Sequence, residues 1–229
     1  SVASRGLGDV YKRQMQILGA ISHDLQTPIT RMKLRTEFMD ASVDRDKLAQ
    51  DLNEVERLVR EGIDYARSAH GKVETPARVE LAAFLESLVY DYQDTGKAVS
   101  LSGDRAGPLS TRPHALRRVL GNLIDNALKF AGAAEVRVEA PEGGPVSIYV
   151  LDRGPGIPAH ELDAVLQPFY RLESSRNRDT GGTGLGLAIA QQLAEVLGAK
   201  LILSPRDGGG LSVEPVSYTH LTLPTILLV

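Results

Sequence analysis

Hydrophobic residues in the first third of the chain recur at alternating spacings of three and four residues, which is typical of helices that pack side by side. One set, with a single polar member, consists of Leu18, Ile21, Leu25, Pro28, Met32, Arg35 and Met39, and the other of Leu48, Leu52, Val55, Val59, Ile63 and Ala66. The polar stretch between them, residues 40–46, has the length of a turn between antiparallel helices. The pattern predicts a helical hairpin over residues 15–70. Because one hairpin cannot cover its own apolar stripe, we expect two copies to form a homodimer built on a four-helix bundle.

The pattern changes after a short polar linker, residues 71–76. From residue 77 onward, short runs of strand-forming residues alternate with longer stretches of helical period. Strands are expected at 77–81, 98–102, 134–140, 146–152, 199–204 and 210–214, and helices at 82–92, 113–131 and 185–197. This interleaving predicts a second domain, residues 77–214, with the architecture of a two-layer α/β sandwich. The expected fold class is an α-helical hairpin followed by an α/β domain.

Composition narrows the classes of protein to which the chain can belong. Of its 229 residues, 42% are hydrophobic and 24% are charged, the balance of an ordinary soluble globular protein with one or two domains. The net charge is −3 with no clustered Lys/Arg stripe, which argues against nucleic-acid binding. The absence of cysteine excludes disulfides, thiolate metal sites and cysteine nucleophiles. No run approaches the ~20 apolar residues of a membrane span, and we expect the chain as given to be soluble.

The two ends differ in character from the rest of the chain. Residues 1–14 and 215–229 resemble translated sequencing-adapter read-through, and we expect both segments to be non-native. On this interpretation the chain is a fragment of a longer protein. A genuine N-terminal arm and C-terminal tail are the alternative.

A cluster of polar side chains lies on one face of the helix expected at 113–131. In the stretch "NLIDNALKF", Asn122 and Asn126 are four residues apart and Lys129 follows three residues later. Two amide oxygens and an ammonium group on one face suit a hydrated Mg²⁺ ion and the phosphates that it bridges. The alternative for this cluster is an ordinary solvent-exposed polar face.

Two glycine-rich stretches follow in the same domain. The stretch "DRGPGIP" comes directly after a hydrophobic strand, where glycines let the backbone approach a planar ligand and Asp152 can accept a hydrogen bond from an exocyclic amine. The alternative is a bare turn. The stretch "GGTGLGLAIA", residues 181–190, opens a helix and presents unpaired N–H groups to an anion. It lacks both the Lys-Ser/Thr pair of a P-loop and the glycine spacing of a dinucleotide-binding turn.

Together, in this order and spacing, the three stretches resemble the N, G1 and G2 boxes of the GHKL (Bergerat) ATP-binding fold shared by histidine kinases, gyrase, Hsp90 and MutL. The stretch "PFYRLESSR" between the last two is similar to the F box that histidine kinases carry in their ATP lid. One departure is that "STRPHAL", before the N-box helix, lacks the aspartate commonly found there.

The resemblance implies a role for each matching residue. Asn126 would bind Mg²⁺ with Asn122 beside it, and Asp152 would read the adenine amino group. Lys129 and Arg171 would face the phosphates, while glycines would shape the pocket and the hinge of the lid. The implied ATP-binding set consists of Asn122, Asn126, Lys129, Asp152, Gly154, Gly156, Ile157, Phe169, Gly182, Thr183, Gly184, Leu185 and Gly186.

The hairpin carries the second part of the resemblance. Taking Leu18 as heptad position a, His23 falls at the outermost position f and should face solvent. Thr27, four residues later, stands over the same face, and Pro28 should bend the helix one turn from the histidine. The stretch "SHDLQTPIT" resembles the H box of sensor histidine kinases, of the H-D-L-x-x-P-x-T type, so that the likeness spans residues 15–214.

The complete resemblance implies a sensor histidine kinase that uses ATP and Mg²⁺. His23 would be phosphorylated with Asp24 as general base and Arg171 on the transferring group, and the phosphoryl group would pass to an aspartate of a response-regulator receiver domain. Thr27 would position water for the reverse, phosphatase activity. The parent protein is expected at a bacterial inner membrane with this region facing the cytoplasm. The alternatives are a non-catalytic nucleotide-binding dimerisation and signalling module, and a GHKL ATPase that labels no protein.

Overall fold

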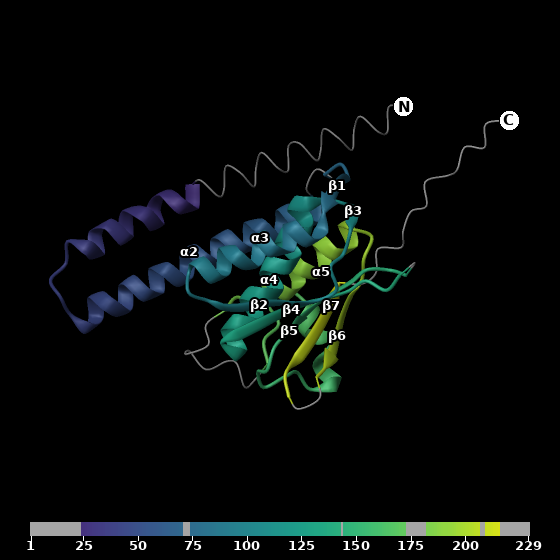
Figure 1. The fold of residues 1–229 in the computed structure, drawn as a ribbon. Helices are drawn as coiled ribbons and strands as arrows, with labels where there is room; N and C mark the ends of the chain where they lie inside the picture. Colours follow the sequence, from purple (N-terminus) through teal and green to yellow (C-terminus); the bar gives the residue numbers. More distant parts are fainter. Residues whose placement is uncertain (1–23, 71–73, 143, 173–181, 207–208, 216–229) are drawn as a thin grey trace, which may run out of the picture. The chain divides into compact units, whose positions relative to one another are not determined.

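The computed structural model describes residues 24–70, 74–142, 144–172, 182–206 and 209–215 (Figure 1). Contacts divide the chain into two compact units, one made of residues up to Lys72 with the segment Gly182–Leu185, and the other of the remaining residues from Val73 onward. The terminal segments expected to be non-native lie outside the described residues, apart from Pro215. No helix among the described residues is long and apolar enough to cross a membrane.

The first unit contains the two helices of the hairpin. Residues 24–37 are helical and continue through Pro28, and α2 (Val43–His70) forms the second arm. The start of α2 lies within the stretch predicted as a turn. The hydroxyl of Ser42 accepts a hydrogen bond from the N–H of Arg45 at 3.1 Å, which is the geometry of a helix N-cap. Asp44 and Asp46 follow in the first turn, where negative charge is favoured.

The two arms of the hairpin bury a narrow set of side chains. Ile29 and Thr36 on the first helix and Leu52 and Ile63 on α2 are each at most 8% exposed. Lys33 forms an ion pair with Glu56 of α2 at 2.8 Å, which ties the arms together. The buried positions on the first helix are therefore neighbours of the predicted hydrophobic seam rather than its members. The described members of that seam, from Leu25 to Met39, are exposed.

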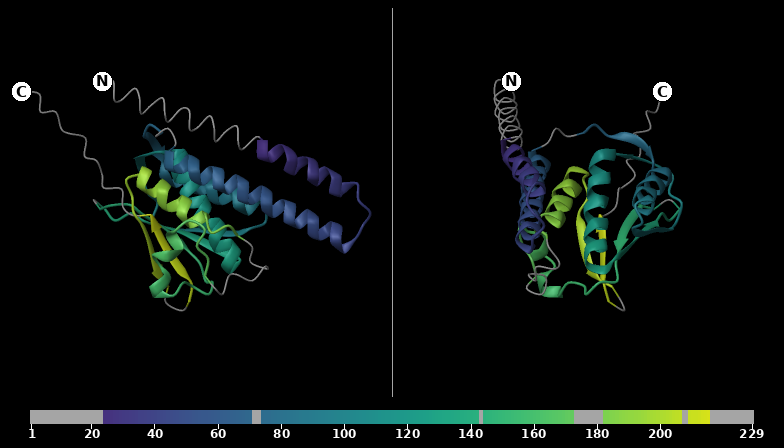
Figure 2. Two further views of the ribbon diagram at one scale, coloured as in Figure 1. Left: turned by 180° about the vertical axis from the view of Figure 1, so that it is seen from behind. Right: turned by 90° about the vertical axis from the view of Figure 1, so that its left-hand side faces the viewer.

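The second unit is built on a five-stranded mixed sheet. In spatial order the strands are β2 (Ala98–Gly103), β4 (Ala133–Glu139), β5 (Ser147–Leu151), β7 (Leu211–Pro215) and β6 (Leu201–Pro205). Strands β2 and β4 are parallel, and all other pairs in the sheet are antiparallel. The helices α3 (Leu81–Asp94), α4 (Pro113–Ala131) and α5 (Gly186–Val196) lie along one face of this sheet (Figure 2). The predicted two-layer α/β sandwich is confirmed.

Three short elements were not predicted. Strand β3 (Pro108–Thr111) pairs antiparallel with β1 (Ala77–Glu80) in a separate two-stranded sheet. Two single-turn 3₁₀ helices, η1 (Ala159–Glu161) and η2 (Ala164–Leu166), follow the G1 stretch. Each of these elements is too short to produce a hydrophobic period in the sequence.

Helix α4 is the centre of the second unit. It begins with Pro113, whose fixed φ suits the first helical position, and it ends at Gly132, which adopts a left-handed conformation with φ of +73°. Its buried face packs against α5 and the sheet. This face consists of Ala115, Leu116, Val119, Leu120, Leu123, Ile124 and Ala127. Burying that stripe fixes the rotation of α4 and so the direction of its polar residues.

Candidate nucleotide-binding site

The polar residues of α4 lie beside its buried stripe. Asn122 and Asn126 are half-buried and Lys129 is exposed, so the three follow one another toward the end of the helix. The side-chain amide of Asn122 donates to the carbonyl oxygen of Arg118 at 2.8 Å, which fixes its orientation. The ammonium of Lys129 lies 4.6 Å from the ring centre of Phe130. The helix therefore offers amide oxygens and a cation at one side of the domain.

Asp152 follows directly on β5 and is held by the main chain. It is 8% exposed, and its Oδ1 accepts hydrogen bonds from the N–H groups of Gly154 at 2.8 Å and Leu211 at 3.2 Å. Among the described residues, all hydrogen bonds of this carboxylate use Oδ1. The second oxygen, Oδ2, is thus the one available to accept a hydrogen bond from a ligand.

Two glycines of the G1 stretch are required by close contacts. A Cβ atom at Gly154 would lie 3.2 Å from the carbonyl oxygen of Phe130 and 3.2 Å from Oδ1 of Asp152. Gly156 has a φ of +72°, and a Cβ there would lie 3.3 Å from the carbonyl oxygen of Gly210. Gly154 thereby lets the G1 loop approach the end of α4, and Gly156 lets it approach the turn between β6 and β7.

The first turn of α5, which is part of the G2 stretch, lies beside α4. A Cβ atom at Gly186 would lie 3.8 Å from Oδ1 of Asn122, so the first turn of α5 lies against the N-box face of α4. Just before it, the hydroxyl of Thr183 accepts a hydrogen bond from the N–H of Leu185 at 3.2 Å. Gly184 has a φ of +75°, a conformation that L residues rarely adopt. Thr183 and Leu185 are buried, whereas Gly182 and Gly184 are half-buried.

The structure thus places the ends of the N, G1 and G2 stretches around one helix. Residues of G1 contact the C-terminal end of α4, and the first residue of α5 contacts its middle. Ile157 of G1 is half-buried. No group of three or more Asp, Glu, His or Cys residues close enough to hold a metal ion occurs within the described ranges.

The F-box residues occupy the last described positions before residue 173. Phe169 is 64% exposed and has a φ of +64°, an uncommon and strained conformation for a non-glycine residue. The hydroxyl of Tyr170 donates to the carboxylate of Glu161 at 2.8 Å, which anchors this segment to η1. Arg171 is half-buried. Its expected place beside the phosphates stays a prediction.

In the hairpin, the phosphoacceptor candidate His23 lies outside the described residues. Asp24 and Thr27 are exposed on the helix, as their predicted positions require. The bend expected at Pro28 stays a prediction.

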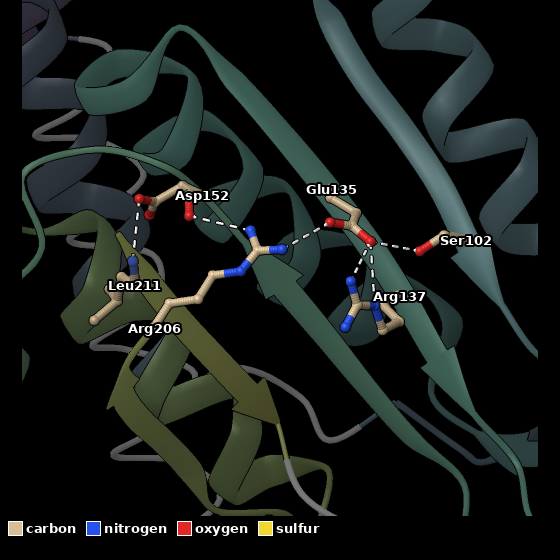
Figure 3. A network of polar contacts seen from close by, with 6 residues as sticks. All are labelled: Ser102, Glu135, Arg137, Asp152, Arg206 and Leu211. Carbon is tan, nitrogen blue, oxygen red and sulfur yellow. Dashed lines mark hydrogen bonds and ion pairs between the residues drawn. The ribbon is translucent and has the colours of Figure 1, made fainter. Parts of the chain in front are cut away.

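One residue beside the site was missed by sequence reasoning. Arg206, in the turn after β6, donates from Nη1 to the carbonyl oxygen of Asp152 at 3.3 Å and from Nη2 to Glu135 at 3.2 Å (Figure 3). The available signal was a cation before three consecutive glycines, in "RDGGG", between the last two strands. Local spacing could not reveal the partners of that cation, which lie 54 and 71 residues away in the sequence.

Comparison with known proteins gives the same assignment for this domain. Residues 111–224 match the family model described as histidine kinase-, DNA gyrase B-, and HSP90-like ATPase. The chain is 39% identical over 202 residues to the sensor histidine kinase GtrS of Pseudomonas aeruginosa, covering 87% of this chain and 41% of GtrS. It is 30% identical over 203 residues to the sensor protein RstB of Escherichia coli K12, covering 85% of this chain and 46% of RstB. The chain therefore spans less than half the length of each of these relatives.

A solved structure has the same architecture over most of the chain. Full-length ShkA in complex with AMPPNP superimposes with a TM-score of 0.66 over 89% of this chain and 46% of ShkA. The sequence identity is 22%, so the likeness concerns the fold alone. It confirms the predicted order of helices followed by an α/β domain.

Proposed function

The chain belongs to the sensor histidine kinase family, and from this premise we propose that it is a protein-histidine kinase that phosphorylates its own His23 with ATP. The observation that carries the proposal is the convergence of the three nucleotide-binding stretches on α4, in a domain of the matching ATPase family. The complex of ShkA with AMPPNP, an analogue of ATP, supports a nucleotide site in this fold.

Asp152 would recognise the base. Its Oδ1 is held by two main-chain N–H groups, and Oδ2 would accept a hydrogen bond from the exocyclic amine of adenine. The glycines around it would allow the planar base to lie against the backbone. A carboxylate held this rigidly loses little entropy on binding, which favours selective recognition.

The phosphates would lie toward Asn122, Asn126 and Lys129. Amide oxygens are hard donors of the kind that Mg²⁺ accepts, and Mg²⁺ usually completes its coordination with water and substrate phosphates. Asn126 would hold the ion with Asn122 beside it, and the ion would supply neutralisation of phosphate charge. Lys129 and Arg171 would add positive charge on the phosphate side of the site.

In the transfer step, an imidazole nitrogen of His23 would attack the γ-phosphorus of ATP. A nitrogen–phosphorus bond forms, the bond from the γ-phosphorus to the bridging oxygen breaks, and ADP leaves with that oxygen. Asp24, the next residue, would accept the proton that the imidazole loses. The phosphoryl group would then pass to an aspartate on a response-regulator receiver domain. Thr27 would position the water that reverses the signal.

The proposed enzyme would act as a homodimer. Leu25 and Met32 lie seven residues apart on the first helix, and Met39 follows at the same spacing just beyond the end of that helix. Their side chains are 43%, 41% and 44% exposed. On α2, Leu48 and Val55 repeat the spacing with 42% and 43% exposure. A mostly apolar stripe on a helical hairpin can be covered by the same stripe of a second copy.

The direct test is phosphorylation of the whole 229-residue chain with γ-labelled ATP and Mg²⁺. The expected label is stable in base and labile in acid, and His23→Gln should abolish it. His160→Gln is the matched control, because His160 is a solvent-exposed histidine of the other unit and should be dispensable. Label that persists in His23→Gln would refute the assignment. ATP hydrolysis without any label would instead identify an ATPase, and nucleotide binding without turnover a non-catalytic module.

A further inference from the structure

Arg206 connects the end of β5 to the neighbouring strand β4. Its side chain is 17% exposed, and its guanidinium lies between the carbonyl oxygen of Asp152 and the carboxylate of Glu135 on β4 (Figure 3). The main chain of the turn is itself closed by hydrogen bonds between Arg206 and Gly210, and between Gly209 and Arg206, each at 3.1 Å. Arg206 is therefore held by hydrogen bonds of its main chain as well as by those of its guanidinium.

Glu135 provides a fixed anchor for that guanidinium. Its Oε1 accepts hydrogen bonds from Ser102 at 2.7 Å and from Arg137 at 3.1 and 2.7 Å, while Oε2 faces Arg206. The hydrogen bonds from Ser102 and then Arg137 hold the pKa of Glu135 below its usual range, so the carboxylate stays ionised at neutral pH. Arg206 thus bridges an anchored charge to the main chain of Asp152.

The same turn contacts Asp152 in two further ways. The N–H of Asp152 donates to the carbonyl oxygen of Leu211 at 3.0 Å, and the N–H of Leu211 donates back to Oδ1 at 3.2 Å. Gly210 has a φ of +104°, and a Cβ there would collide with the carbonyl oxygen of Asp152. The main chain and the side chain of Asp152 are consequently both located by the turn that carries Arg206.

We propose that Arg206 is a positioning residue for base recognition, which sets the preference of the site for a 6-amino purine nucleoside triphosphate over a 6-oxo one. This inference rests on the proposed function, in which the carboxylate of Asp152 accepts a hydrogen bond from the amine of adenine. A 6-oxo purine presents a carbonyl oxygen to the same carboxylate, and two acceptors repel each other. If the carboxylate is displaced by about an ångström, the hydrogen bond to the 6-amino group is lost, and the repulsion between the carboxylate and the 6-oxo group is also relieved.

The ratio of the affinities for the 6-amino and the 6-oxo nucleotide therefore distinguishes a positioning role of Arg206 from an effect on the stability of the fold. A variant that only lowers the folded fraction weakens binding of both nucleotides by the same factor and leaves the ratio unchanged. A variant that lets Asp152 move lowers the ratio. In autophosphorylation kinetics, the weaker binding of ATP should raise KM for ATP more than it lowers kcat. The reason is that Arg206 positions the residue that contacts the base, whereas the transferred phosphate is remote from the base.

The experiment compares dissociation constants for ATP and inosine triphosphate, measured by calorimetry on the whole chain, together with the KM and kcat of autophosphorylation. Arg206→Gln should lower the preference for ATP by about five- to tenfold, the free energy of about one hydrogen bond. Arg206→Lys should restore part of the preference. The matched control is Arg137→Gln, which removes another cation from Glu135 without a contact to Asp152 and should leave the preference unchanged.

Each outcome bears on one of the two claims. If the wild type does not prefer ATP, or if Asp152→Asn keeps the preference, then the assignment of Asp152 as base reader fails irrespective of Arg206. If both behave as expected and Arg206→Gln keeps the full preference, or if Arg137→Gln lowers it equally, then the role of Arg206 is refuted. Should Arg206→Gln fail to fold, Arg206→Lys and Glu135→Gln carry the test, and an unchanged ratio in both refutes the role.

Discussion

The guanidinium of Arg112 donates a hydrogen bond to the carbonyl oxygen of Glu74 at 2.6 Å. The same guanidinium donates to the carbonyl oxygen of Val196 at the end of α5, at 2.8 Å. The carboxylate of Glu74 in turn accepts from the N–H groups of His114 and Ala115, at 3.1 and 3.2 Å. Arg112 is the N-cap residue of α4 and forms no capping hydrogen bond of its own. Glu74 therefore supplies, from the segment that enters the domain, the cap that the sequence before α4 lacks.

Removal of this distant cap should destabilise the second unit. We expect Glu74→Ala to lower the free energy of unfolding by about 1 kcal/mol, because two N–H groups at the start of α4 lose their acceptor. Urea denaturation with a near-ultraviolet or fluorescence signal from the second unit measures the change. Glu80→Ala is the control, since Glu80 is 69% exposed and its carboxylate is 4.0 Å from Arg78. Equal losses in the two variants would contradict the capping role.

The proposed homodimer predicts which substitutions in the exposed stripe of the hairpin should prevent dimerisation. Met32→Glu places a charge in the stripe and should raise the dimer dissociation constant by about tenfold or more. Leu34→Glu is the control. Leu34 is 50% exposed, but it lies two residues after Met32 and therefore on nearly the opposite side of the helix from the stripe. Sedimentation equilibrium distinguishes the two variants. A monomeric wild type, or a dimer that Leu34→Glu dissociates as readily as Met32→Glu, would argue against this interface.

The elements that could be predicted from the sequence are those with local signals. Helix α4 was predicted with its observed bounds, because Pro113 marks its start, Gly132 its end, and its apolar residues keep one period. Asn126 and Asp152 were predicted as site residues because each belongs to a short motif, and their roles stay a prediction. By contrast, Ser42 was placed inside a turn, although it caps α2.

The contacts that could not be predicted join residues far apart in the chain. Arg206 and Asp152 are separated by 54 residues, and Glu74 and His114 by 40. A lone arginine or glutamate in a polar stretch carries no indication of its partner, because many surface charges are merely solvated. Strand β3 was missed for a related reason, since its four residues become a strand through pairing with β1.

The anchored carboxylate of Glu135 predicts a pH dependence of stability. Its pKa lies below the usual value of 4.5, chiefly because of the hydrogen bond from Ser102 and then that from Arg137. A carboxyl with a lowered pKa in the folded state contributes stability above its unfolded pKa, and that contribution is lost as the pH falls through the folded value. Glu135→Gln should therefore differ most from the wild type near neutral pH and converge with it on acidification.

The measurement is urea denaturation of both proteins between about pH 6 and pH 3, which brackets the range in which a carboxyl titrates. Glu86→Gln is the control, because its ion pair with Arg105, at 3.8 Å, lies on an exposed surface where solvent screens it. A difference between Glu135→Gln and the wild type that stays constant across this range would contradict the predicted linkage.

The close approach of Gly154 to two oxygen atoms makes this position sensitive to a single added methyl group. In Gly154→Ala the new Cβ would lie 3.2 Å from both Oδ1 of Asp152 and the carbonyl oxygen of Phe130. Oδ1 is held by hydrogen bonds from two main-chain N–H groups, and the carbonyl oxygen belongs to the last turn of α4. Overpacking of about 1–3 kcal/mol should displace the carboxylate that we propose recognises the base, and so weaken ATP binding about tenfold or more. Gly107→Ala is the matched control, because a Cβ there meets nothing within 4 Å. Calorimetric titration with ATP provides the comparison, and equal affinities in the two variants would indicate that the G1 loop is free to shift.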